Sequence, residues 1–270
     1  SLVSVPANGL GRLSIHSAPL LTRVELPGTA HVGELDLVGV TSLAELDLSD
    51  TTSIDVLHVH GSDALTGLDG LSTVEDIGTL TLESDTALTS LDGLSSLVSL
   101  DSLRLENTPA LTSLGSITEL TALGSLHVQG APLLTSLGTF SSLSSLDGLT
   151  LEGLPALADL GSFPSLTTLN VLTLADLPAL TNTGGLAGLT SINGLTIERT
   201  ELLLDVDGLA SLTSLGGLTL RDNLSLVDID GLSSVTTFTG DFRVTGNDAL
   251  VSVVGLAGAG TTSLGDFVLA

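Results

Sequence analysis

The sequence predicts an all-β fold, a β-solenoid of about twelve turns with short parallel strands and few or no helices. The first observation is a leucine or phenylalanine that recurs at a nearly constant interval: Leu13, Leu35, Leu57, Leu80, Leu103, Leu126, Leu149, Leu172, Leu195, Leu218, Phe242 and Phe267. The first two intervals are 22 residues, the next seven are 23, and the last two are 24 and 25. A fixed period in this range is typical of stacked repeats.

The second observation is the spacing of apolar residues inside one copy, at 100–123. Leu103 and Leu105 are two residues apart, so both face one side of a short strand while Arg104 faces the other. From residue 111 onward the apolar residues recur at every third position. This spacing fits neither a long strand nor a full helix, and it predicts a return path that turns corners. One turn cannot bury its own leucines, so neighbouring turns must stack.

The unbroken repeat predicts a single elongated domain over 1–270. Residues 1–9 read as a lead-in strand that adds one more rung and ends near Pro6. Residues 10–240 hold the regular turns, and 241–270 form irregular terminal turns.

Turn residues mark the corners of the coil. Gly permits positive φ, and Asp hydrogen-bonds its local backbone. Asp-Gly pairs at 69–70, 92–93, 147–148, 207–208 and 230–231 predict tight bends. Thr-Ser and Ser-Ser pairs at 89–90, 112–113, 135–136 and 213–214 predict hydroxyl ladders on the outside of the return path.

The composition excludes several classes of partner. The formal net charge is −25, with 31 acidic residues against six basic ones. Nucleic acids and anionic membranes require clustered Lys and Arg, so neither is an expected partner. No apolar run is long enough for a membrane span, so no membrane insertion is expected. There is no cysteine, which excludes disulfides and thiolate metal sites.

Two segments resemble a known family. Gly-Leu-Thr-Leu-Glu-Gly-Leu-Pro-Ala-Leu at 148–157 and Leu-Thr-Ser-Leu-Asp-Gly-Leu-Ser-Ser-Leu at 88–97 are similar to the leucine-rich-repeat β-solenoid of the receptor L-domain-like type. The resemblance implies recognition at an extracellular or bacterial cell surface, after removal of a signal peptide. It brings no catalytic motif. The chain departs from the ordinary repeat at the asparagine that follows the strand, which is present as Asn223 but is replaced by Thr108 or Ala131 in other copies.

The expected function is therefore non-enzymatic. We expect an interaction scaffold, or adhesin-like binding module, that binds a protein or surface ligand on the flat strand face. The alternative is a structural protomer that stacks head-to-tail with copies of itself into an extracellular fibre. Solenoid ends expose an unpaired strand, so the expected self-association residues are Val3, Val5, Phe267 and Leu269. The ends could instead be capped by their own irregular turns, or continue into a longer protein.

One candidate metal site lies on the strand face. His58 and His60 are two residues apart, so both face outward from one strand. Asp36 is expected on the rung before His58, and Glu83 on the rung after His60. Two imidazoles and two carboxylates are ligands for zinc or a similar ion, which would also permit a metal-dependent reaction. The alternative is a group of ordinary surface histidines.

A second candidate is an aspartate cluster, Asp205, Asp207, Asp228 and Asp230. The two pairs are one repeat apart, so four carboxylates should crowd two neighbouring turns. Like charges at short range repel unless a cation lies between them, and Ca²⁺ accepts such oxygen ligands. Calcium is therefore the one cofactor that the sequence analysis retains as a candidate. The alternative is a set of bend-forming aspartates that point into water.

Overall fold

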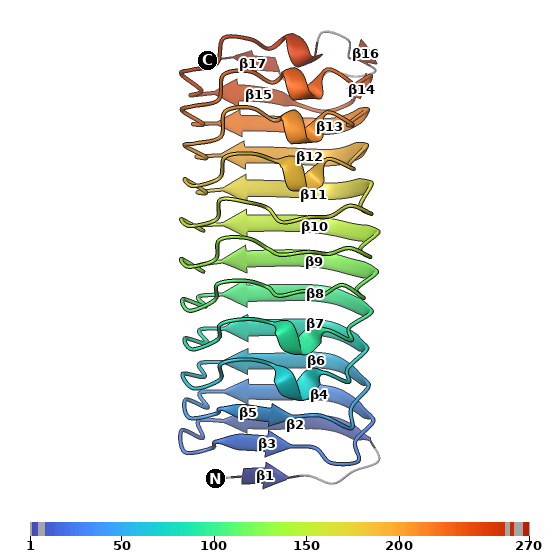
Figure 1. Ribbon diagram of the computed structural model, residues 1–270, viewed down its shortest axis with the longest axis vertical. Helices are drawn as coiled ribbons and strands as arrows, with labels where there is room; N and C mark the ends of the chain where they lie inside the picture. Colours follow the sequence, from blue (N-terminus) through green and yellow to red (C-terminus); the bar gives the residue numbers. More distant parts are fainter. Residues whose placement is uncertain (1, 5–8, 257–259, 262–266, 270) are drawn as a thin grey trace.

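The computed structural model describes residues 2–4, 9–256, 260–261 and 267–269, and it describes side chains as far as residue 255. The chain coils into a tall stack of rungs, and its first and last strands lie at opposite ends of the stack (Figure 1). The predicted β-solenoid with short parallel strands is confirmed. Within the described residues, no helix is long and apolar enough to cross a membrane.

One long parallel sheet forms the main face of the stack. Its strands are β2 (Leu10–His16), β4 (His31–Val38), β6 (Ser53–His60), β7 (Asp76–Glu83), β8 (Ser99–Glu106), β9 (Ala122–Gln129), β10 (Ser145–Glu152), β11 (Thr168–Ala175), β12 (Ser191–Glu198), β13 (Ser214–Arg221), β14 (Thr237–Phe238), β15 (Phe242–Thr245), β16 (Gly260–Thr261) and β17 (Phe267–Leu269). The register aligns each predicted opening residue with the next, from Leu13 opposite Leu35 to Phe242 opposite Phe267. The repeat interval therefore corresponds to one rung.

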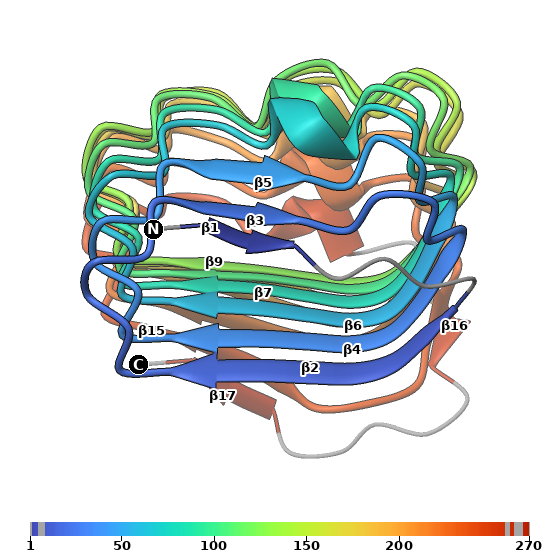
Figure 2. The same cartoon turned by 90° about the horizontal axis from the view of Figure 1, so that it is seen from below.

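A second, smaller sheet covers the opposite face at the N-terminal end (Figure 2). It contains β1 (Leu2–Ser4), β3 (Arg23–Glu25) and β5 (Glu45–Asp47), all parallel. The lead-in strand β1 therefore pairs within this second sheet and not within the main sheet, a placement that the sequence analysis did not specify. Its Val3 lies opposite Val24 of β3.

Further along the stack, short 3₁₀ turns replace this second sheet. They are η1 (Asp69–Leu71), η2 (Asp92–Leu94), η3 (Gly184–Leu186), η4 (Asp207–Leu209), η5 (Asp230–Leu232) and η6 (Val254–Leu256). Four of the five Asp-Gly pairs lie in these turns, as the bend prediction requires. The pair at 147–148 is an exception, because it lies inside β10. The residues on either side of this pair, Leu146 and Leu149, pair with β9 and are buried. The pair therefore belongs to a strand and not to a bend.

The core is a column of leucine layers. In the copy at 100–123 every residue of the predicted apolar set is at most 1% exposed, namely Leu100, Leu103, Leu105, Leu111, Leu114, Ile117, Leu120 and Leu123. Each layer is covered by the layers on both sides, which is what a single turn could not achieve.

The hydroxyl groups of the return path do not form the predicted ladders with one another. Thr89 Oγ1 donates to the Thr66 carbonyl at 3.0 Å, and Thr112 Oγ1 donates to the Thr89 carbonyl at 3.3 Å. Thr213 Oγ1 makes the same bond to the Thr190 carbonyl at 3.1 Å. Each of these three hydroxyls thus donates to a carbonyl of the previous rung that also accepts the amide of the same threonine.

Some copies bury a polar side chain at the position five residues after the opening leucine. Asn223 Oδ1 accepts the Thr200 amide at 3.0 Å, and Asn223 Nδ2 donates to the Ile197 carbonyl at 2.9 Å. Asp85 occupies the same position six repeats earlier, is fully buried, and accepts the Ser62 amide at 2.8 Å. Asn223 and Asp85 thus each connect to the backbone of the preceding rung, whereas other copies bury an apolar residue at this position, such as Leu154 and Leu177.

Candidate functional site

The outward face of the main sheet changes in chemistry along the stack. The residues directly after the opening leucines form one column along this face: Ser14, Asp36, His58, Thr81, Arg104, His127, Thr150, Thr173, Thr196, Thr219 and Arg243. The charged and imidazole groups of the first half are Asp36, His58, Arg104 and His127, whereas the second half has four successive threonines followed by Arg243. The two halves therefore offer different binding surfaces.

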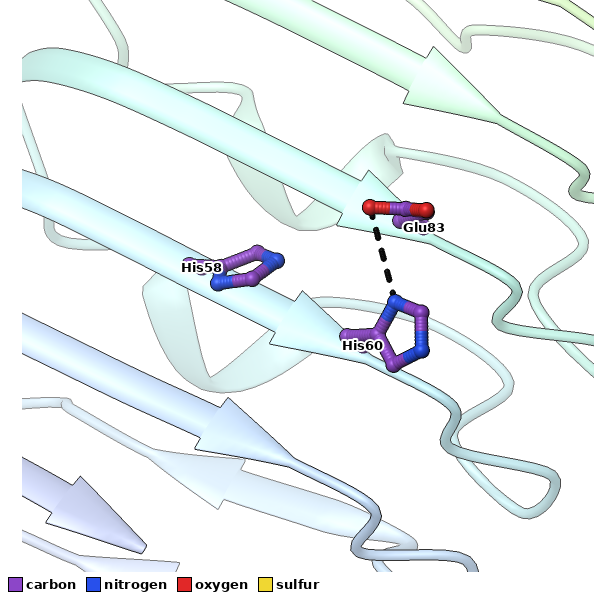
Figure 3. A group of neighbouring side chains, drawn as sticks. All are labelled: His58, His60 and Glu83. Carbon is purple, nitrogen blue, oxygen red and sulfur yellow. Dashed lines mark ion pairs between the residues drawn. The ribbon is translucent and has the colours of Figure 1, made fainter. Parts of the chain in front are cut away.

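His58, His60 and Glu83 lie together on the first half (Figure 3). Their candidate ligand atoms all lie within 4.8 Å of one another. His60 Nδ1 is 3.5 Å from Glu83 Oε2, because the register sets these two residues opposite each other on β6 and β7. The three side chains are partly exposed, at 31%, 37% and 35%, so an ion in solution can reach them.

Asp36 does not belong to this group of three, although the register sets it opposite His58. Its Oδ1 is 3.0 Å from His58 Nδ1, and its Oδ2 is 2.8 Å from His16 Nε2. The hydrogen bond from His16 is the main cause that lowers the pKa of Asp36, with the bond from His58 acting in the same direction. Asp36 is thus an ionised carboxylate that holds two imidazoles.

The aspartates at 205–230 do not converge on one point. Among the described residues, they form no group of three whose ligand oxygens lie within 4.8 Å of one another. Asp205 Oδ1 accepts the amide of Asp207, and Asp228 Oδ1 accepts the amide of Asp230, both at 3.0 Å. The charge of Asp205 is the main cause that raises the pKa of Asp207. The carboxylates are close enough to repel, but one of each pair closes its own turn.

The described residues of the second half form a groove of about 520 Å³ along the edge where the strands end. It crosses four turns and is lined by Gly153, Pro155, Asp176, Pro178, Arg199, Glu201, Asp222 and Leu224. Pro155, Pro178, Glu201 and Leu224 share one repeat position of the lining, and Gly153, Asp176, Arg199 and Asp222, called the charged wall here, share the other. Leu202 and Leu204 nearby are each 54% exposed. The groove thus combines exposed apolar surface with a few charged groups.

Arg199 organises the charged wall. Its Nε and Nη2 donate to the two carboxylate oxygens of Asp176 at 2.5 and 2.8 Å, and its Nη1 donates to Glu198 at 2.9 Å. Arg221 donates to the same Glu198 oxygen at 2.6 Å. The Arg199 guanidinium lowers the pKa of Asp176, and Asp176 is the main cause that raises the pKa of Arg199. The wall is therefore an ordered ionic network.

The sequence analysis did not identify this groove. Three of its four charged residues, Asp176, Arg199 and Asp222, stand four positions after the opening leucine and have positive φ, between 52° and 57°. Other copies have glycine there, such as Gly130 and Gly153. A signal was present, because three charged residues replace glycine at consecutive repeats.

The predicted self-association residues are only partly described. Val3 is half-buried in β1, and Val5 lies outside the described residues. Phe267 and Leu269 belong to β17, which pairs with β15, while their side chains also lie outside the described part.

Comparisons with known proteins give likenesses to solved structures alone. No protein-family model matches the sequence, and no curated protein matches it. Among solved structures, the chain is similar to an internalin from Listeria monocytogenes, with 14% sequence identity and a TM-score of 0.37. The alignment covers 97% of this chain and 87% of the internalin. At this level of similarity the fold assignment stands on the strands, register and core described above: the chain is a leucine-rich-repeat-like β-solenoid.

Proposed function

We propose that the chain is a non-enzymatic recognition module that binds a protein ligand in the groove beside β10–β13. The groove itself is the observation that carries this proposal. Binding sites are concave, with apolar walls and a small number of oriented polar groups, and the groove has these properties. Its length over four turns suits an extended peptide segment better than a compact small molecule.

The charges of the groove favour a basic peptide. Arg199 is already paired with Asp176 and Glu198, so its charge is compensated. Glu201 and Asp222 add further carboxylates to the lining. The net charge of −25 attracts cationic segments over longer range and raises their association rate. A ligand with Lys or Arg beside apolar residues would match both walls.

The backbone conformation at the groove supports the same function. An arginine at positive φ costs about 1–3 kcal/mol, and such strain persists where the surroundings compensate it. Here the bidentate pair with Asp176 fixes the Arg199 side chain along the charged wall. A glycine at position 199 would remove the backbone strain, but it would also remove the guanidinium group that orders the charged wall.

A displayed library of random peptides tests the proposal. We expect selected peptides to be enriched in Lys or Arg next to apolar residues. Leu224→Arg inserts a positive charge into the groove and should weaken those peptides at least tenfold. Leu133→Arg is the matched control, because Leu133 and Leu224 are each 53% exposed but only Leu224 lines the groove. Failure to select peptides, or equal loss in both variants, would contradict the proposal.

The proposed location of this module is outside the cell or on the cell surface. The absence of cysteine and methionine supports this location, since easily oxidised side chains are missing. Fractionation of the native source, with detection by antibody, tests it. Recovery in the cytosol alone would contradict it.

A second candidate function is end-to-end assembly into a fibre. The inward side chains of the first main strand, Leu10, Leu13 and Ile15, are only half-buried, whereas Leu35 and Leu37 one rung later are fully buried. A second copy that docks on this rung would cover them. Such a contact is not self-complementary, so it would repeat into a filament.

A further inference from the structure

We propose that His58, His60 and Glu83 bind a zinc ion, and that Asp36 positions His58 for this role. The site lies on β6 and β7, in the other half of the sheet from the peptide groove, so this inference does not depend on the proposed recognition function. It also changes the role of Asp36 from the fourth ligand that the sequence predicts to a residue behind the ligands.

The separation of two ligand atoms already fits zinc. In a tetrahedral site with bonds of about 2.0–2.1 Å, two ligand atoms lie about 3.4 Å apart. His60 Nδ1 and Glu83 Oε2 are 3.5 Å apart. The third ligand atom, on His58, lies within 4.8 Å of both. Rotation of the partly exposed His60 and Glu83 side chains can close a gap of about 1 Å while His58 keeps its bond to Asp36.

Asp36 determines which nitrogen His58 offers. A carboxylate accepts a hydrogen bond, so His58 Nδ1 carries the proton toward Asp36 and Nε2 keeps its lone pair. A carboxylate behind a histidine ligand fixes the ring orientation and raises the basicity of the other nitrogen. Asp36 is itself held on its second oxygen by His16. The arrangement is therefore built over three consecutive rungs, β2, β4 and β6.

The charge of the site favours a divalent cation. Glu83 supplies the only carboxylate among the three ligands, and the neighbouring cation on the next rung, Arg104, pairs with Glu106. Two neutral imidazoles and one carboxylate are a common set for zinc. Three protein ligands leave a fourth position for water or for a group of another molecule.

Titration of EDTA-treated, dialysed protein with Zn²⁺ by isothermal calorimetry tests the site. We expect saturable binding of one ion per chain. His60→Ala and Glu83→Gln should each weaken it at least tenfold. His127→Ala is the matched control, because His127 also lies beside a carboxylate, Glu106 at 3.4 Å, and should leave the affinity unchanged. Circular dichroism of each variant checks that the fold is retained.

Substitution with Co²⁺ separates the positioning role from the ligand role. Asp36→Asn should weaken binding about 10- to 100-fold while it preserves the tetrahedral absorption bands of bound cobalt, because the three ligands remain. An unchanged affinity would overturn the role of Asp36. Absence of one-site binding in the wild-type chain, or the same loss in His127→Ala as in His60→Ala, would overturn the zinc site itself.

Discussion

Asp85 is the one fully buried carboxyl group among the described residues, and it occupies the position that Asn223 has six copies later. At the equivalent position Asn223 accepts one backbone amide and donates to one backbone carbonyl. Asp85 Oδ1 accepts the Ser62 amide, but Asp85 Oδ2 has no hydrogen-bond partner. Burial is the main cause that raises the pKa of Asp85 to about 7. A protonated Asp85 can donate a hydrogen bond as Asn223 does, whereas an ionised one cannot.

Stability should therefore fall as the pH rises through this group's titration. The pKa of Asp85 is about 7 in the folded chain and near 3.8 in the unfolded chain, so the folded state binds more protons between these values. The contribution of Asp85 to the free energy of unfolding is complete below about pH 4 and is lost as the pH approaches 7. The total loss is at most about 4 kcal/mol.

Asp85→Asn tests this explanation. We expect the free energy of unfolding at pH 8 to rise by about 1–3 kcal/mol, because the amide satisfies both neighbours without a buried charge. Denaturant unfolding in EDTA, at pH 5 and pH 8, measures the difference. Asp101→Asn, at an exposed position, is the control and should change stability little at either pH. A variant at residue 85 that is no more stable than wild type at pH 8 would contradict the burial argument.

At the scale of one element, the 3₁₀ turns depend on glycine for close packing between rungs. A Cβ atom on Gly93 of η2 would overlap the Leu68 carbonyl of the previous turn. Gly70, Gly208 and Gly231 meet the preceding backbone in the same way. The tight stacking of these turns thus explains why glycine recurs in them.

Gly93→Ala should destabilise the chain by about 1–3 kcal/mol, because the clash is with backbone that the sheet holds in place. Gly194→Ala is the matched control: no heavy atom lies within 4 Å of its added Cβ, and a strand favours alanine over glycine. Urea unfolding of both variants compares them. Equal stability of the two would show that the turns adjust by moving apart.

At the scale of the whole molecule, the repeat interval made the fold predictable. The constant interval between leucines determines the length of a rung and the register between neighbouring strands. The period of two inside each copy determines which side chains form the core, since each rung must bury the same positions. The same interval predicted that Glu83 lies beside His60, because the two residues are one repeat apart and occupy paired positions of neighbouring strands.

Other features could not be obtained in this way. The crossing of β1 to the second sheet depends on how the chain enters the first rung, which no repeat determines. The groove depends on the direction of Arg199 and Asp222, whose left-handed backbone aims them along the edge. The burial of Asp85 is a third such feature, because an aspartate is rarely fully buried and its sequence alone favours the surface.

End-to-end assembly is a property of the whole rod. Like-charged rods repel, and salt shortens the range of this repulsion to about 3 Å at 1 M. If the ends dock, negative-stain micrographs at high salt should contain particles of several rod lengths. Val3→Asp places a charge near the first rung and should shorten them. Particles of one length at every salt and protein concentration would contradict the fibre proposal.

The constant register of the main sheet fixes the distance between any two sites along the stack. Each copy advances the chain by one strand spacing, about 4.8 Å, so the distance between the histidine group on β6 and the groove beside β11 is set by the number of copies between them. Duplication or loss of one whole copy would change that distance by a single increment and leave every other layer intact. The molecule can therefore vary its reach in discrete steps while the chemistry of both surfaces stays the same.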